Sequence, residues 1–210
     1  MSKSFRKISI PALAMTGMVL VAGVVLASNM AQFTLKINPG TLAVDIVDGT
    51  YATIAAPAIA FAPVTASMVS ETSTATLGSP TQQILVSNPD AAPNGWTTSI
   101  AATAAKWQDA GNTVNFDYKN DVATSGQLAI DPSVGVLTHG KSTAANTGVV
   151  KGSASNFSST VASITLLDAD ATSAKIGDWT LQGVALTQTI PAMQTAADYS
   201  LPMTISVVAK

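Results

Sequence analysis

The feature that most constrains the fold of this chain is a two-residue alternation of apolar and polar side chains, repeated in short segments between turn residues. In the clearest segment five apolar residues follow this spacing: Tyr199, Leu201, Met203, Ile205 and Val207. A period of two places alternate side chains on one face of a strand. Shorter runs alternate in residues 114–118, 128–130 and 164–166, and beyond residue 27 no helical spacing is sustained. We therefore predict an all-β fold, a sandwich or a barrel, and expect a β-sandwich of short, mostly antiparallel strands.

One segment, residues 176–192, changes phase along its length. Trp179 and Leu181 share one parity, and the apolar residues after Gly183 share the other: Val184, Leu186 and Ile190. This change predicts a bulge at Gly183, where the strand bends and its core-facing side switches. We expect Trp179 to be largely buried. Farther on, Pro202 cannot donate to a sheet ladder, so it predicts an edge position or a bulge for the final strand.

The first 27 residues have the pattern of a targeting signal. Lys3, Arg6 and Lys7 form a positively charged start, and an uncharged apolar run follows over residues 8–27. Small residues end this run and predict cleavage after Ala27, and the alternative is an uncleaved membrane anchor. In either case we expect an N-terminal hydrophobic signal helix and an exported, extracellular chain that meets the membrane only through this segment.

The rest of the chain has no linker long enough to divide it. We predict an N-terminal strand arm over residues 28–49 and one β domain over residues 50–210. Within the arm, residues 32–49 have the pattern of a strand pair around Asn38, Pro39 and Gly40. This pair either joins the sandwich or extends to pair with a neighbouring molecule.

Few side chains in this sequence can carry out chemistry. The chain has no cysteine and one histidine, His139, which lies beside a glycine in a turn. A phosphate-binding loop is excluded, because Gly135 does not stand at the spacing that such a loop needs before Gly140 and Lys141. Only 10% of the residues are charged and the net charge is −2, so the sequence offers no basic surface for nucleic acid. We expect no enzyme activity, no cofactor and no nucleic-acid partner.

Three aspartates are candidates for a calcium site. Asp168 and Asp170 are one residue apart, and Asp178 follows in the same region. Carboxylate oxygens are the ligands that calcium prefers, although the spacing does not match an EF-hand loop. The alternative is that these aspartates form turns.

The tryptophans have two possible roles. Trp96 and Trp179 each follow a turn and begin a predicted strand, and Trp107 lies between them. In the first role they anchor the core, because a tryptophan buries a large apolar area. In the second they form an exposed aromatic platform for sugar rings, with Trp96 and Trp107 as possible glycan contacts.

Two tryptophan motifs and the closing segment resemble the WxL surface domain of bacterial cell walls. The second motif, WTLQGVALTQTIPA, keeps Trp179 and Leu181, and the alternating segment DYSLPMTISVV follows it with Tyr199. In the first motif, NGWTTSI, Trp96 is kept and Thr98 stands where the family has leucine. The segments PAIAFAPVTAS and QQILVSNPDAAPNGW are also similar to that family's strands, and the likeness covers residues 50–210. The segment GTLAVDIVDG is faintly similar to camelysin and TasA-like matrix fibre proteins.

The resemblance implies an exported structural or adhesive protein of the cell surface or cell wall, held noncovalently through this domain. Its partners would be peptidoglycan or other surface proteins. The sequence holds no Leu-Pro-x-Thr-Gly sorting motif, so we expect retention through the fold, through self-association or through the N-terminal segment. Two alternatives stay open: a self-assembling filament subunit that donates its N-terminal strand, and a small carbohydrate-binding module.

Overall fold

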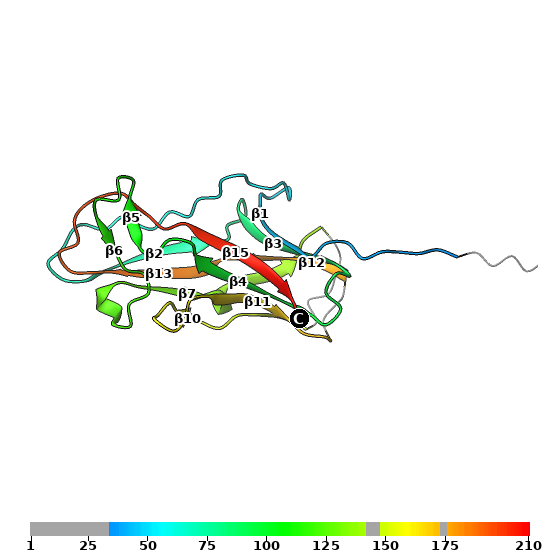
Figure 1. Cartoon of the computed structure of the whole chain (residues 1–210). Coiled ribbons are helices and arrows are strands. Elements are labelled where there is room, and N and C mark those ends of the chain that lie inside the picture. Colours follow the sequence, from blue (N-terminus) through cyan, green and yellow to red (C-terminus); the bar gives the residue numbers. More distant parts are fainter. Residues whose placement is uncertain (1–33, 142–147, 173–175) are drawn as a thin grey trace, which may run out of the picture. The chain divides into compact units, whose positions relative to one another are not determined.

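A computed structural model describes residues 34–141, 148–172 and 176–210 of the chain (Figure 1). The signal helix predicted over residues 1–27 lies outside the described residues. The chain divides into a unit of residues 1–37 and a compact unit of residues 38–210. The predicted all-β class is confirmed: the described residues form four small antiparallel sheets and contain no α-helix. No helix among them is long and apolar enough to cross a membrane.

Two of the sheets are joined by the segment that changes phase in the sequence. The first sheet has the order β1–β3–β12–β8 and the second the order β10–β7–β13–β2. The strands of the first are Ala43–Val47 (β1), Gln83–Pro89 (β3), Ile176–Gln182 (β12) and Val136–His139 (β8). The strands of the second are Ser155–Asn156 (β10), Gln127–Asp131 (β7), Val184–Ile190 (β13) and Glu71–Leu77 (β2). Only Gly183 separates β12 from β13, so one stretch of chain contributes a strand to both sheets.

The junction between these sheets needs glycine. Gly183 has a φ of 74° and its N–H donates to the carbonyl of Gly78, which has a φ of 84°, at 2.6 Å. A Cβ on Gly78 would lie 2.8 Å from Cα of Gln182, and one on Gly135 would lie 2.8 Å from the carbonyl oxygen of Gln182. Gly78 and Gly135 therefore let neighbouring stretches of backbone approach closely where the sheets meet, and Gly183 supplies the positive φ of the junction.

The predicted change of core-facing side at Gly183 is confirmed. Trp179 and Leu181 are buried before it, and Val184 and Leu186 are buried after it. The change occurs at a junction between two strands, since β12 pairs with β3 whereas β13 pairs with β2. A single bulged strand would instead have kept one partner.

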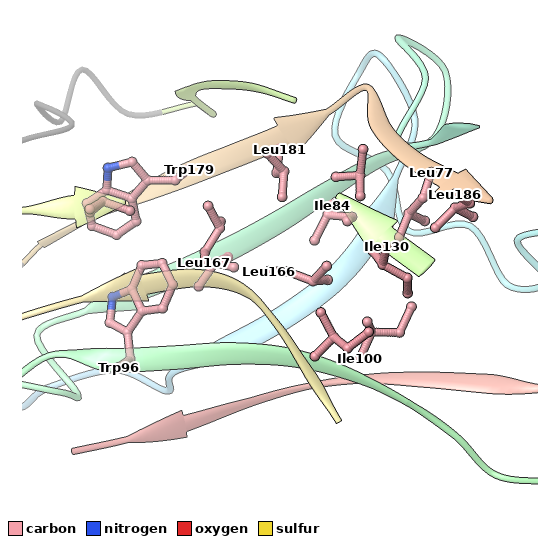
Figure 2. Packing of buried hydrophobic residues seen from close by; sticks show 14 of the residues in the cluster. Leu77, Ile84, Trp96, Ile100, Ile130, Leu166, Leu167, Trp179, Leu181 and Leu186 are labelled. Carbon is pink, nitrogen blue, oxygen red and sulfur yellow. The ribbon is translucent and has the colours of Figure 1, made fainter. Parts of the chain in front are cut away.

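A third sheet supplies the other side of the core. Its order is β15–β4–β11–β9, with strands Met203–Ala209 (β15), Trp96–Ala102 (β4), Ile164–Ala169 (β11) and Val149–Lys151 (β9). Side chains from this sheet and from the first two form one buried cluster (Figure 2). At one end of the labelled residues in Figure 2, the rings of Trp96 and Trp179 lie 5.6 Å apart between centroids. Both side chains are 0% exposed, which confirms the predicted burial of Trp179.

The final alternating segment is divided between two sheets. Tyr199–Ser200 (β14) pairs with Trp107–Asp109 (β5), which also pairs with Asn115–Phe116 (β6), and these three strands form the fourth sheet. After Pro202 the chain enters β15, which pairs only with β4 in its sheet. The predicted edge position of this final strand is therefore confirmed. Two short 3₁₀ turns, Ala123–Ser125 (η1) and Pro132–Val134 (η2), complete the described elements.

The predicted strand pair over residues 32–49 is only half present. Residues 43–47 form β1, which pairs with β3 of the same chain, with Val44 opposite Val86. The described residues before it, 34–42, form no strand. At the predicted turn, the Gly40 N–H donates to the Pro89 carbonyl of β3 at 2.8 Å, and residues 38–40 have no assigned turn. The Gly40 N–H therefore bonds to β3 and not to another strand of the arm. The prediction of a strand before Asn38 is wrong for residues 34–37.

Candidate functional site

A pocket of 390 Å³ lies where β2 begins and β13 ends. Residues 61–69 and 190–199 form much of its wall, and the small sheet of β5, β6 and β14 contributes aromatic rings. In Figure 1, β2 and β13 lie toward the end that holds β5 and β6, at the left. The strands β3 and β12 lie toward the other end. The volume is near the lower end of the range of about 300–1,000 Å³ that is typical of small-ligand sites.

Four aromatic rings form a connected cluster at this pocket. Trp107 stacks on Phe116, with ring centroids 5.9 Å apart and an interplanar angle of 11°. Phe61 meets Trp107 at 90° and 5.5 Å, and Tyr199 meets Phe116 at 77° and 5.0 Å. Phe116 is buried and the other three rings are half-buried. The cluster offers an apolar surface whose rings are held in place by one another.

Neutral hydrogen bonds fix the polar groups around these rings. Trp107 donates from Nε1 to Oε1 of buried Gln188 at 2.8 Å. Tyr199 accepts from Nε2 of Gln194 at 2.7 Å and donates to the carbonyl of Thr195 at 2.6 Å. Between the two wall segments, the Met193 N–H donates to the carbonyl of Ser67 at 2.7 Å. The two wall segments are therefore tied to each other and to the rings.

Two carboxylates line the pocket, Glu71 and Asp198. Glu71 stands opposite Ile190 and has the same strand parity as Ser73 and Leu77, which are buried on the inward face of β2. Neither carboxylate has a hydrogen bond or an ion pair with another described residue. Other aspartates accept hydrogen bonds from described neighbours: Asp45, Asp48, Asp109, Asp117, Asp121, Asp131, Asp168, Asp170 and Asp178. Among the described residues that line the pocket there is no lysine, arginine or histidine, so it is an acidic site.

The residues of the two tryptophan motifs separate in the structure. Trp96, Thr98, Trp179 and Leu181 are all buried in the core, whereas Tyr199 lies at the pocket. Of the two tryptophans considered as glycan contacts, Trp96 has no exposed surface. Trp107, which lines the pocket and is half-buried, is the one that a ligand can reach.

The three calcium candidates do not come together as a ligand set. Asp168 accepts hydrogen bonds from Oγ1 of Thr97 at 2.6 Å and from Nζ of Lys210 at 2.8 Å. Asp170 accepts from the backbone and hydroxyl of Thr172, in a turn, and Asp178 accepts from a backbone N–H. Among the described residues no group of three or more acidic, histidine or cysteine side chains could hold a metal ion.

The electrostatics of Asp168 fit a structural ion pair. Desolvation of this half-buried carboxyl raises its pKa, but hydrogen bonds from Lys210 and Thr97 outweigh that effect and hold the pKa below its ordinary value. The side chain of Lys210 is 38% exposed, so the pair is well solvated. It ties the end of β15 to β11 and makes at most a modest contribution to stability.

Sequence reasoning identified Trp107 and Tyr199 but missed the acids and amides of the pocket. One signal was present for Gln188, because it continues the inward parity of Val184 and Leu186 and a polar residue at such a position needs a partner. Glu71 gave no such signal, since its strand, ETSTATL, is polar on both faces over most of its length.

Comparisons with known proteins give no further assignment: no family model, no curated protein and no solved structure matches the chain.

Proposed function

We propose that this chain is an exported, noncatalytic protein of the cell surface, with a structural or adhesive role and noncovalent attachment to the envelope through a WxL-like domain. The proposal is carried by the way the three segments of the resemblance meet. Trp96 packs against Trp179, and β15 pairs along the whole of β4, with Ala209 opposite Trp96 and Val207 opposite Thr98. Segments that are far apart in the sequence thus form one core.

This arrangement supports a scaffold role for the tryptophan motifs. Two sheets on one side and one on the other bury a shared cluster, and we infer that they form a β-sandwich. Trp96, Thr98, Trp179 and Leu181 are inside this core, so contacts with the envelope must come from other surfaces. The pocket at the end of β2 and β13 is the best candidate, because it combines aromatic rings with polar groups. Its partner would be peptidoglycan or another surface protein.

Retention on purified cell walls tests the proposal. The full chain is incubated with walls, the walls are washed and pelleted, and the bound fraction is measured by quantitative immunoblotting. A matched variant, Thr204→Ser, changes an exposed residue on β15 and should bind like the wild type. If neither purified walls nor intact cells retain the wild-type chain, the proposal is wrong.

A second candidate, a carbohydrate-binding module, is favoured by one observation. Trp107 alone of the three tryptophans is partly exposed, and it lies in the pocket. Sugar rings pack their apolar faces on such aromatic side chains, and Trp96 and Trp179 would not respond to a ligand in the pocket. Tryptophan fluorescence should therefore change on glycan addition, and Trp107→Phe should abolish the change. Unchanged fluorescence across a panel of wall and surface glycans would exclude this role.

A further inference from the structure

A short segment before the compact unit has the chemistry to fill the pocket. Leu35 is 87% exposed and Ile37 is 82% exposed, and Lys36 lies between them. Residues 34–37 form no strand or helix. Leu35 and Ile37 are the most exposed large aliphatic side chains among the described residues apart from methionine, and they can bury this surface against an apolar partner.

The pocket is complementary to this segment in charge and in polarity. Glu71 and Asp198 have no partner among the described residues, and no cation in the described chain lines the pocket. The mouth is also apolar, since Val64 and Val69 line it with 41% and 65% of their surface exposed. A lysine ammonium in this pocket can pair with a carboxylate of Glu71 or Asp198, and the partly exposed ring of Trp107 lines the same pocket.

The segment cannot reach the pocket of its own chain. Gly40 is bonded to Pro89, which stands opposite Ile176 at the start of β12, whereas Glu71 stands opposite Ile190 at the end of β13. The strands from Ile176 to Ile190 span about 45 Å if straight, and a right-angle bend would still leave about 30 Å. The four residues from Lys36 to Gly40 span at most about 14 Å.

We propose that residues 34–37 of one copy dock into the pocket of a second copy, with Lys36 between Glu71 and Asp198 and with Leu35 and Ile37 on the apolar mouth. The donor and the acceptor are different surfaces, so the contact is heterologous. Each copy then offers a free segment at one end and a free pocket at the other, and the assembly grows head to tail. Residues 43–47 stay paired with β3 of their own chain, so this contact differs from donation of the whole arm.

Cysteine cross-linking tests the contact directly, because the chain has no cysteine of its own. The double variant Lys36→Cys/Asp198→Cys is made in the full chain and oxidised on intact expressing cells. It should give a ladder of dimers, trimers and longer species on a non-reducing gel, and reduction should collapse the ladder. The single variants can form at most dimers.

The matched control is Lys36→Cys/Thr204→Cys, in which the second cysteine is on exposed β15 outside the pocket. It should give no more than the dimers of the single variants. A ladder of equal intensity from this pair, or no ladder from Lys36→Cys/Asp198→Cys, would overturn the proposal.

Charge exchange provides a second test that needs no cross-link. Lys36→Glu places an acid against the acidic pocket, and the double variant Glu71→Lys/Asp198→Lys places two cations against Lys36, so each variant alone should stay monomeric by light scattering. Mixed in equal amounts, the two should polymerise, because each segment then meets a pocket of opposite charge. If the mixture behaves as the separate variants do while the wild type polymerises, the pairing is wrong.

Wall binding is scored separately for the monomeric variants. A Lys36→Glu chain that is monomeric and still retained by walls supports both proposals, because the pellet assay measures attachment and light scattering measures assembly. If walls do not retain the wild-type chain, the proposed function is wrong. The cross-linking result would still decide the proposed contact between copies. A glycan that occupied the pocket would instead shorten the ladder of the double-cysteine variant in proportion to its concentration.

Discussion

Replacing Thr98 with valine should make the protein more stable. The Thr98 side chain is 0% exposed, and its hydroxyl has no hydrogen-bond partner among the described residues. In register it stands between Leu167 and Val207 on neighbouring strands. An unpaired buried polar group costs about 1–3 kcal/mol, and valine has the same shape with a methyl group in place of the hydroxyl. We expect Thr98→Val to raise the free energy of unfolding by about 1–2 kcal/mol and the Tm by about 2–6 °C.

The assay is urea unfolding followed by tryptophan fluorescence, and Thr180→Val is the matched control. Thr180 is also buried, but its hydroxyl lies 2.7 Å from the hydroxyl of Thr138 and is hydrogen-bonded. That substitution removes a made bond, so we expect no gain and a loss of up to about 1 kcal/mol. If Thr98→Val is less stable than the wild type, the Thr98 hydroxyl is hydrogen-bonded in solution and the reasoning fails.

Three further predictions concern the strand junction, the ion pair and the pocket. Gly183→Ala should cost about 1 kcal/mol, and Gly78→Ala should lower stability by more. The reason is that a Cβ on Gly78 meets backbone at 2.8 Å, whereas one on Gly183 meets nothing closer than 3.9 Å. The urea midpoints of the two variants give the order. The folded-state pKa of Asp168 lies below its ordinary 3.8, so the stability that its carboxylate contributes is present at neutral pH and lost as the pH falls below that value. Asp168→Asn should therefore destabilise by less than about 1 kcal/mol at pH 7, with the difference shrinking in acid denaturation curves below pH 3.8. Gln188→Ala removes the acceptor of Trp107 Nε1, so stability should fall by about 1–3 kcal/mol and the Trp107 fluorescence should shift, with unchanged emission contradicting the bond.

The strands that the sequence predicted best are those in which large apolar residues recur at every second position over part of the strand. In β4 the parity of Trp96 and Ile100 gives the observed burial, and in β13 the same holds for Val184 and Leu186. These local patterns suffice because a half-buried strand imposes its period on every second residue. Burial also places Thr98 inside, although its own chemistry gives no reason for that position.

Irregular strands were harder to predict because long-range pairing decides them. In β11 a shift in register between Thr165 and Leu167 lets Leu166 and Leu167 both be buried, which a strict two-residue period does not allow. The closing segment alternates without interruption in sequence, yet Tyr199 pairs with β5 and Met203 pairs with β4. Nothing local to this segment encodes the change of partner except Pro202.

The pocket could not be predicted because its parts come from four separate regions of the chain. Trp107 and Tyr199 were noticed as single aromatic residues, but their contact through Phe116 depends on the pairing of β5 with β6 and β14. The inward position of Glu71 depends on the register of β2 against β13. Register of this kind is a property of two strands together, so neither strand alone reveals it.

The joined strands β12 and β13 connect the two surfaces that the proposed assembly uses. Their start lies beside Pro89, where the segment leaves the compact unit, and their end lies at the pocket beside Glu71. The angle at Gly183 therefore sets the direction, within the compact unit, from Gly40 to the pocket. Gly183→Ala leaves both contact surfaces unchanged but must alter a backbone with a φ of 74°. We expect this variant to keep the cross-linked ladder and to change the repeat or the curvature of the polymers in negative-stain images. An unchanged repeat together with a lowered urea midpoint would mean that the junction affects stability without setting the geometry of assembly.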